Sequence, residues 1–206
     1  MAAPVAPPGW GAHHEVMTTD DVQPILDALK TVAVALKEES VPFALAGGYA
    51  VYARGGADSR HDADVVILEE DVHRARTALK GRELEVVDPP EDWLFKVRHG
   101  GEQVDVIHRL ASGPVDRALL GRAREMSVDS VVMPVMSATD LLVSKLAAMT
   151  EHYCDMSPVL SMVRSLREQV DVGMVERATG DSPFARAALG LARDLGLLPE
   201  DEEQST

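Results

Sequence analysis

The segment LAGGYAVYARGGADSRHDADVVI, residues 45–67, places two glycines after one apolar run and two aspartates directly before another. In a strand, residues i and i+2 point to the same face, so the carboxylates of Asp62 and Asp64 are expected to project together. Two carboxylates this close on one face raise each other's pKa. Burying them at the start of a strand also costs free energy unless a positive charge lies nearby. The segment therefore predicts a site that receives cations.

A third aspartate, Asp105, lies in the strand-like run QVDVI. If this strand neighbours the one that follows Asp64, three carboxylates meet at one place. Mg²⁺ binds a few protein carboxylates together with substrate phosphate oxygens. Two such ions about 4 Å apart can hold the attacking and the leaving oxygen of a phosphoryl displacement. We therefore predict a magnesium site at Asp62, Asp64 and Asp105.

The Gly47-Gly48 pair follows a predicted strand and opens a predicted helix. Without Cβ atoms, the backbone approaches a phosphate closely, and the N–H groups at a helix start attract anions. Ser59 and Arg60, shortly before the aspartates, add a hydroxyl and a fixed positive charge. These four residues are predicted to bind a triphosphate.

Hydrophobic periodicity and turn residues give an α+β chain with strands in its first half and helices in its second. We expect a mixed β-sheet with helices on one face, followed by a C-terminal helical bundle. The predicted strands are 42–46, 62–68, 83–87, 93–97, 102–108 and a short extended run at 131–136. The predicted helices are 18–40 (capped by Thr19 or Asp20), 47–53, 69–80, 115–126, 137–149 (capped by Ser137) and 157–195, with breaks near Gly173 and at 180–183.

This pattern predicts four segments along the 206 residues. They are a flexible N-terminal arm (1–18), a catalytic core (19–112), a helical domain that closes the cleft (113–198) and an acidic tail (199–206). The Gly100-Gly101 pair is expected to form a hairpin turn. Trp93 and Phe95 are read as core or cleft wall rather than a platform for stacking bases.

The composition narrows the possible partners and compartment. Thirty-four acids against 20 Lys and Arg give a formal charge of -14, which suits a cationic small molecule and is a poor match for nucleic acid. The single cysteine, Cys154, excludes an internal disulfide and fits a reducing cytoplasm. No apolar run is long enough to span a membrane, and the N-terminus has no secretory pattern. Glu151–Asp155 contains His, Cys and Asp, but lacks the further spaced ligands of a zinc site.

Taken together, these features resemble the nucleotidyltransferase superfamily of the DNA polymerase β type. The likeness rests on Gly-Gly at a helix start, the Ser-x-His-Asp-x-Asp segment 59–64, Asp105 on a later strand, and a later helix that carries Lys145. It covers residues 41–155. The chain is most similar to minimal bacterial members, which include antibiotic nucleotidyltransferases and toxins of type IV toxin–antitoxin pairs of the AbiEii kind.

The resemblance implies roles for single residues. Asp62 and Asp64 would bind two Mg²⁺ ions, and Asp105 would complete the site and help to activate the acceptor hydroxyl. The residues that it assigns to the nucleoside triphosphate, such as ATP, are Gly47, Gly48, Ser59 and Lys145. Many members have Thr or Ser two residues before the first aspartate, where this chain has Arg60. Lys145 also lies beside a helical apolar stripe, so it could instead extend along the edge of the core.

The function that follows is transfer of a nucleoside monophosphate from a nucleoside triphosphate to a hydroxyl, with Mg²⁺. The acceptor stays open between a small molecule and a macromolecule. In the second case the chain would be a toxin that modifies tRNA 3′ ends or protein and has an antitoxin partner. Arg117, Arg122 and Arg124 on one segment, with Arg164 and Arg167 on another, are candidates for a tRNA-binding surface. A further alternative is a nucleotide-binding module without turnover.

Overall fold

The structure is a computed structural model, and it describes residues 23–57, 63–82 and 84–199. Its centre is a seven-stranded mixed sheet in the order β3-β4-β5-β2-β1-β9-β8. The strands are β1 (Phe43–Ala46), β2 (Ala63–Ile67), β3 (Glu85–Val87), β4 (Leu94–His99), β5 (Glu102–Ile107), β8 (Arg124–Val128) and β9 (Val131–Val135). A two-stranded ribbon is formed by β6 (Arg109–Leu110) and β7 (Gly113–Pro114).

Two helices pack side by side against the sheet, α1 (Gln23–Glu38) and α3 (Val72–Lys80), with the short 3-10 turn η2 (Glu69–Asp71) leading into α3. α1 forms because its apolar residues recur at helical spacing, and residues such as Leu29, Val32 and Leu36 are fully buried. The strand residues on the same side, Val97, Val104 and Val106 among them, are also fully buried. The predicted α+β class, with a mixed sheet and a helical second half, is confirmed.

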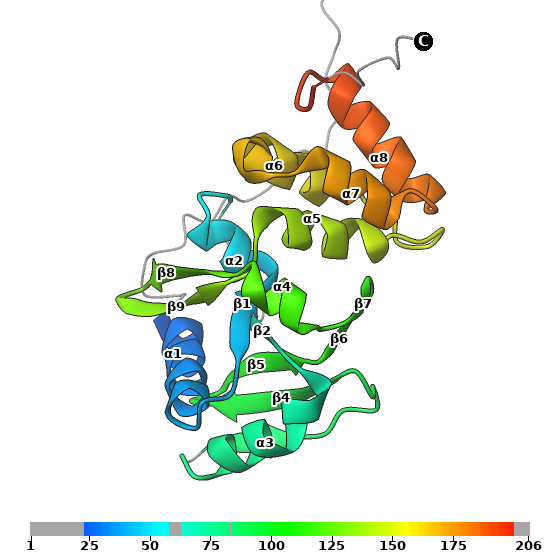
Figure 1. Cartoon of the computed structure of the whole chain (residues 1–206). Coiled ribbons are helices and arrows are strands. Elements are labelled where there is room, and N and C mark those ends of the chain that lie inside the picture. The colour runs from blue at the N-terminus through cyan, green and yellow to red at the C-terminus, as the bar shows by residue number, and fades with distance from the viewer. Residues whose placement is uncertain (1–22, 58–62, 83, 200–206) are drawn as a thin grey trace, which may run out of the picture.

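The second half of the chain places its helices at one end of the sheet (Figure 1). They are α4 (Arg117–Gly121), α5 (Ala138–Ala147), α6 (Ser157–Leu166), η3 (Arg167–Gln169), α7 (Val172–Thr179) and α8 (Pro183–Asp194). α5 contacts α2 (Gly47–Ala53) on one side and α6, α7 and α8 on the other. α5 therefore joins the helical part of the chain to the part that carries the Gly-Gly step.

Several local predictions are confirmed by the backbone. Gly100 and Gly101 both have positive φ, 59° and 91°, and connect β4 to β5 as a two-residue hairpin. The Ser137 hydroxyl accepts a hydrogen bond from the backbone N–H of Asp140 and so caps α5. The predicted caps Thr19 and Asp20, the N-terminal arm and residues 200–206 of the tail lie outside the described residues.

The prediction of one helix over residues 115–126 is wrong. Asp116 caps a helix that ends at Gly121, and the chain then forms β8, which pairs with β9 in antiparallel register. β8 is an edge strand with exposed polar residues such as Arg124 and Glu125, so its sequence lacks the apolar alternation of a half-buried strand. Both strands lie in 113–198, where only a short extended run at 131–136 was predicted, and β9 confirms that run. The division of the chain into domains stays a prediction.

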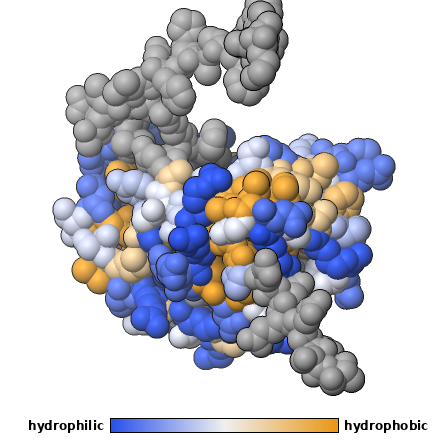
Figure 2. Space-filling view, turned by 90° about the horizontal axis from the view of Figure 1, so that it is seen from above, coloured by the Kyte–Doolittle hydropathy of each residue, from blue (hydrophilic) through white to orange (hydrophobic). Residues whose placement is uncertain are grey.

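The predicted helix break near Gly173 is displaced. The chain leaves helical conformation at Val170 and Asp171, Asp171 caps α7, and Gly173 lies inside that helix. The break at 180–183 is confirmed, because α8 begins at Pro183 after the cap Ser182. Seen from above, the surface at the helical end shows hydrophobic areas among hydrophilic residues (Figure 2).

Among the helices in the described part of the chain, none combines the length and the apolar character needed to cross a membrane.

Candidate functional site

Three neighbouring strands bring Lys96, Asp105 and Asp64 into one row across the sheet. Asp105 on β5 lies opposite Asp64 on β2 in parallel register, and opposite Lys96 on β4 in antiparallel register. Neighbouring strands are about 4.8 Å apart, and side chains at paired positions point to the same face. The expectation that the strand of Asp105 neighbours the strand of Asp64 is therefore confirmed. The row is on the face opposite Val104 and Val106, which are fully buried.

The carboxylate of Asp105 is held from two directions. Its Oδ1 accepts a hydrogen bond of 2.9 Å from Nε2 of Gln103, two residues earlier on the same strand. The ammonium of Lys96 lies 3.4 Å from Oδ1 and 3.5 Å from Oδ2. The side chain of Asp105 is 14 % exposed and that of Lys96 is 26 % exposed. The carboxylate is thus oriented, neutralised in charge and still reachable from solvent.

Gly47 lies directly against the carboxylate of Asp64. A Cβ atom at Gly47 would come within 2.8 Å of Cγ of Asp64, and closer still to its Oδ2. The backbone of Gly47 also has a φ of +59°, a conformation that residues with a Cβ rarely adopt. Gly47 is needed here for two independent reasons, its backbone conformation and the close approach of an acidic side chain. The first helical turn of α2 therefore begins beside Asp64.

A cleft of about 600 Å³ opens at this point. Gly47, Gly48 and Asp64 line one side of it, and Lys145 lies on another. The remaining wall is mostly apolar and comes from α2, β5, β6, α5, α6 and the segment just before α5. It includes Val51, Ile107, Leu110, Met136, Leu141, Ala148, Pro158 and Met162, with the hydroxyls of Ser144 and Ser161 among them. A volume of this size suits a small organic molecule.

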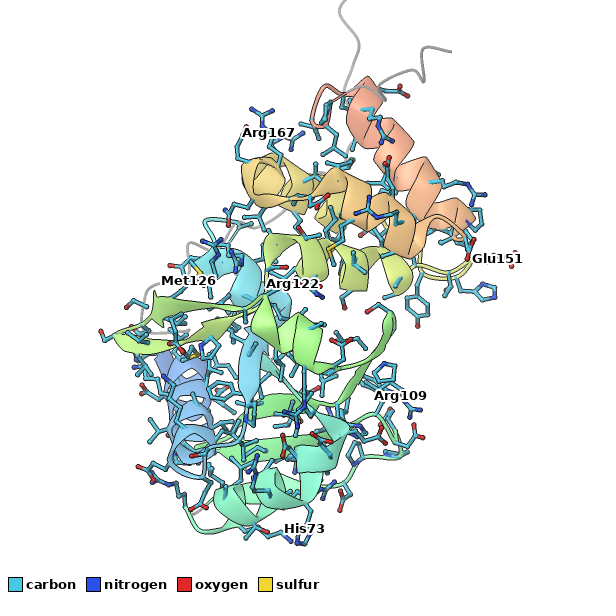
Figure 3. The ribbon with its side chains drawn as sticks, viewed as in Figure 1. His73, Arg109, Arg122, Met126, Glu151 and Arg167 are labelled. Atoms are coloured by element: carbon cyan, nitrogen blue, oxygen red, sulfur yellow. The ribbon has the colours of Figure 1, made fainter. Side chains whose placement is uncertain are left out.

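The position of α5, and with it that of Lys145, is fixed by an ion pair between the exposed Arg122 and the buried Asp140. Nε and Nη2 of Arg122 donate hydrogen bonds of 2.9 and 2.7 Å to the two carboxylate oxygens of Asp140. Asp140 is only 5 % exposed. The Ser137 hydroxyl donates to the same carboxylate. Arg122 lies between α4 and β8 and faces α5 (Figure 3). A bidentate pair of this kind fixes direction as well as distance.

A second arginine joins α2 to the helical part of the chain. Arg54, which follows the last residue of α2, donates to the backbone carbonyls of Val135 and Met136, just before α5. It also donates to Gln169, whose amide donates back to the carbonyl of Arg54. Burial is the main cause that lowers the pKa of Arg54. This contact sets the spacing between two helices that line the cleft.

The structure brings together some of the predicted site residues and leaves others outside its described part. Gly47, Gly48, Asp64 and Lys145 line one cleft, and Asp105 lies beside Asp64. Asp62, Ser59 and Arg60, together with His61, lie outside the described residues. Within 23–57, 63–82 and 84–199, no three His, Cys, Asp or Glu side chains gather as a metal site. The carboxylates of Asp64 and Asp105 form a pair, and a pair of carboxylates is what Mg²⁺ uses when substrate phosphates supply other ligands.

Two kinds of residue in the site were not found from the sequence. Lys96 and Gln103 contact Asp105, and the strand period gives the signal, since Gln103 is two residues from Asp105 and shares its face. The apolar wall from α6 gave no such signal, because its residues are indistinguishable by pattern from core residues. Phe95 is buried, as expected, with the Arg76 guanidinium 4.4 Å from its ring centre. The same prediction is wrong for Trp93, which is 39 % exposed and is not among the residues that line the cleft.

No protein-family model matches the chain, and no curated protein matches it in sequence. Solved structures do match it. The solution structure of the antibiotic-resistance factor ANT(2″)-Ia aligns with a TM-score of 0.55 at 17 % identity, over 82 % of this chain and 97 % of that one. The lincosamide antibiotic adenylyltransferase LnuA, with lincomycin bound, aligns with a TM-score of 0.41 at 14 % identity, over 66 % and 88 % of the two chains. At these identities the first likeness establishes a common fold.

Proposed function

We propose that this chain, which has the nucleotidyltransferase fold, transfers a nucleoside monophosphate from a Mg²⁺-bound nucleoside triphosphate to a hydroxyl group of a small acceptor molecule. One observation carries the proposal: Asp64 and Asp105 lie opposite each other in register, and Asp64 lies directly beside the Gly47-Gly48 start of α2 in an open cleft. This places a carboxylate pair next to a backbone that approaches phosphate closely.

Each residue of the site has a role in this proposal. Asp64 and Asp105, with Asp62 from outside the described residues, would hold Mg²⁺, and two ions are expected. Bound Mg²⁺ would polarise the phosphoryl oxygens and offset the charge that develops on them. The backbone of Gly47 and Gly48, with the side chains of Ser59 and Arg60, would hold the triphosphate.

The reaction would be an in-line displacement at the α-phosphorus. The acceptor oxygen forms a bond to the α-phosphorus while the bond to the oxygen that leads to the β-phosphorus breaks, and pyrophosphate leaves. Asp105 would accept the proton of the acceptor hydroxyl, because it is the carboxylate of the pair that Gln103 orients. Lys145, across the cleft, would meet the phosphates as negative charge builds up on the leaving group.

Two observations favour a small acceptor over tRNA. Arginines that were candidates for an RNA-binding surface are paired with acids: Arg117 with Glu70, Arg122 with Asp140, and Arg167 with Glu168. They also lie apart, since Arg167 is at the outer helical end, away from Arg122 (Figure 3). The cleft wall is largely apolar, as in sites that bury small molecules. A toxin role with an antitoxin partner would require a macromolecular acceptor instead.

The test is a transfer assay with each of the four labelled nucleoside triphosphates and Mg²⁺, against a panel of hydroxyl-bearing antibiotics, bulk tRNA and cell protein. We expect pyrophosphate release together with an acceptor that gains the mass of one nucleoside monophosphate. Asp64→Asn and Asp105→Asn should each lower turnover by at least about 10³-fold, the scale on which charged transition states depend on such groups. Asp88→Asn, an exposed carboxylate elsewhere, serves as the matched control.

The outcomes separate the alternatives. Labelled tRNA or protein without a labelled small molecule would favour the toxin reading. Binding of Mg-nucleoside triphosphate with no transfer to any acceptor would favour a non-catalytic nucleotide-binding module. Full activity in folded Asp64→Asn and Asp105→Asn proteins would refute the proposed mechanism.

A further inference from the structure

The contact between Lys96 and Asp105 is not required by the proposed reaction, and it lies on the carboxylate that the reaction uses. Lys96 belongs to the rigid β4–β5 hairpin, where all six residue pairs from Leu94↔Ile107 to His99↔Glu102 are in register. Its ammonium lies at nearly equal distances, 3.4 and 3.5 Å, from the two oxygens of Asp105. The ammonium therefore lies where a cation shared by both oxygens would be attracted.

The row of charges explains why a cation is useful at this position. Asp64 and Asp105 are paired across β2 and β5, so two carboxylates lie on neighbouring strands in a partly buried setting. Keeping two such carboxylates ionised costs free energy unless a positive charge lies nearby. Lys96 completes the row at the third strand and supplies that charge.

From this geometry we infer that Lys96 is a built-in counter-ion of the proposed magnesium site, which occupies Asp105 in the metal-free protein and competes with Mg²⁺ for it. The inference rests on the proposed function, because it takes Asp105 as a metal ligand. Lys96 is 26 % exposed, so its head has solvent into which it can move. Gln103 donates to Oδ1 of Asp105 at 2.9 Å and keeps the carboxylate oriented when the ammonium leaves.

Lys96 is a positioning residue in this account, and its effect appears in metal binding without turnover. With Lys96→Met, Mg²⁺ no longer displaces an ammonium. We expect the Kd for Mg²⁺, fitted from the rise of Tm with Mg²⁺ concentration, to fall about fivefold, the scale of a partly exposed ion pair. In EDTA the variant should have a lower Tm than the wild type, because Asp105 then loses its contact with the Lys96 ammonium. This difference in Tm should shrink at saturating Mg²⁺.

Two further variants make the experiment specific. Arg98→Met removes a positive charge from the same face of β4, two residues from Lys96 and opposite Gln103, and should leave the Mg²⁺ response unchanged. Lys96→Arg keeps the charge and should resemble the wild type. Asp64→Asn should lose most of the response, which shows that the response reports this site.

Each result has a definite meaning. If the wild type responds to Mg²⁺ but Lys96→Met has an unchanged or higher Kd for Mg²⁺, the counter-ion role is overturned and the proposed function stands. If Lys96→Met does not fold, a Lys96→Arg protein whose Kd for Mg²⁺ differs severalfold from that of the wild type overturns the role as well. The absence of any Mg²⁺ response in the wild type overturns both the inference and the metal site on which it rests.

Discussion

Replacing Gly47 by alanine should lower the rate of transfer by at least about 10²-fold while leaving the protein folded. The added Cβ would lie 2.8 Å from Cγ of Asp64, whereas ordinary non-bonded carbon contacts lie at about 3.5 Å or more. The carboxylate of Asp64 must therefore retreat by most of an ångström or rotate away. A misplacement of about 1 Å at a catalytic group costs on the order of 10²-fold in rate. The φ of +59° adds about 1–2 kcal/mol of backbone strain.

The matched control is Gly55→Ala. Gly55 also has positive φ, +93°, but a Cβ there meets no atom within 4 Å, so this variant has the backbone strain without the contact. Chemical denaturation should show Gly55→Ala destabilised by the backbone strain alone and Gly47→Ala destabilised at least as much, because its Cβ also contacts Asp64. The transfer assay should show a loss of at least about 10²-fold for Gly47→Ala and near wild-type activity for Gly55→Ala. Equal activity in the two variants would refute the argument that Gly47 is needed for the position of Asp64.

Three further predictions concern the walls of the cleft and the core. Lys145→Met should lower kcat/KM by about 10- to 100-fold with no change in Tm, as measured by steady-state kinetics, because Lys145 is exposed in the cleft. Arg54→Met should lower the free energy of unfolding, measured by denaturation with urea, by about 2–3 kcal/mol, because hydrogen bonds from a charged group to buried carbonyls are lost. Gln169→Leu should lower this free energy by less. Burial lowers the pKa of His108, and its Nδ1 has no hydrogen-bond partner among the described residues. The unfolded state therefore binds more protons than the folded state below about pH 6.5, so the free energy of unfolding should fall as the pH falls through that value. His108→Leu should weaken this fall, whereas His73→Gln, at an exposed position, should not.

The sequence was informative wherever a single local rule decides the structure. The Gly100-Gly101 pair predicts a hairpin turn, and Ser137 predicts a helix start. The alternation of side chains along a strand places Asp105 on the face opposite Val104 and Val106. The contact between the strands of Asp64 and Asp105 depends instead on how distant parts of the chain pair. β2 and β5 are separated along the chain by β3 and β4, and they pair in parallel only because the β3–β4–β5 meander folds back beside β2.

The remaining features depend on tertiary contacts that leave no periodic signal. β8 has exposed polar residues and is extended because β9 pairs with it, so a helix was expected there. Lys145 is in the cleft because the Arg122–Asp140 pair fixes the orientation of α5, and these residues are 18 positions apart in sequence. Lys96 lies beside Asp105 only once the β4–β5 register is known.

The central claim is that Asp64 and Asp105 hold a divalent cation next to the Gly47-Gly48 step. Crystals grown with Mn²⁺ and a non-hydrolysable nucleoside triphosphate test this most directly, through the anomalous signal of manganese. We predict a peak between the two carboxylates, with phosphate oxygens from the nucleotide among its ligands and the triphosphate against the start of α2. A nucleotide bound elsewhere, or a manganese peak that touches neither aspartate, would contradict the account.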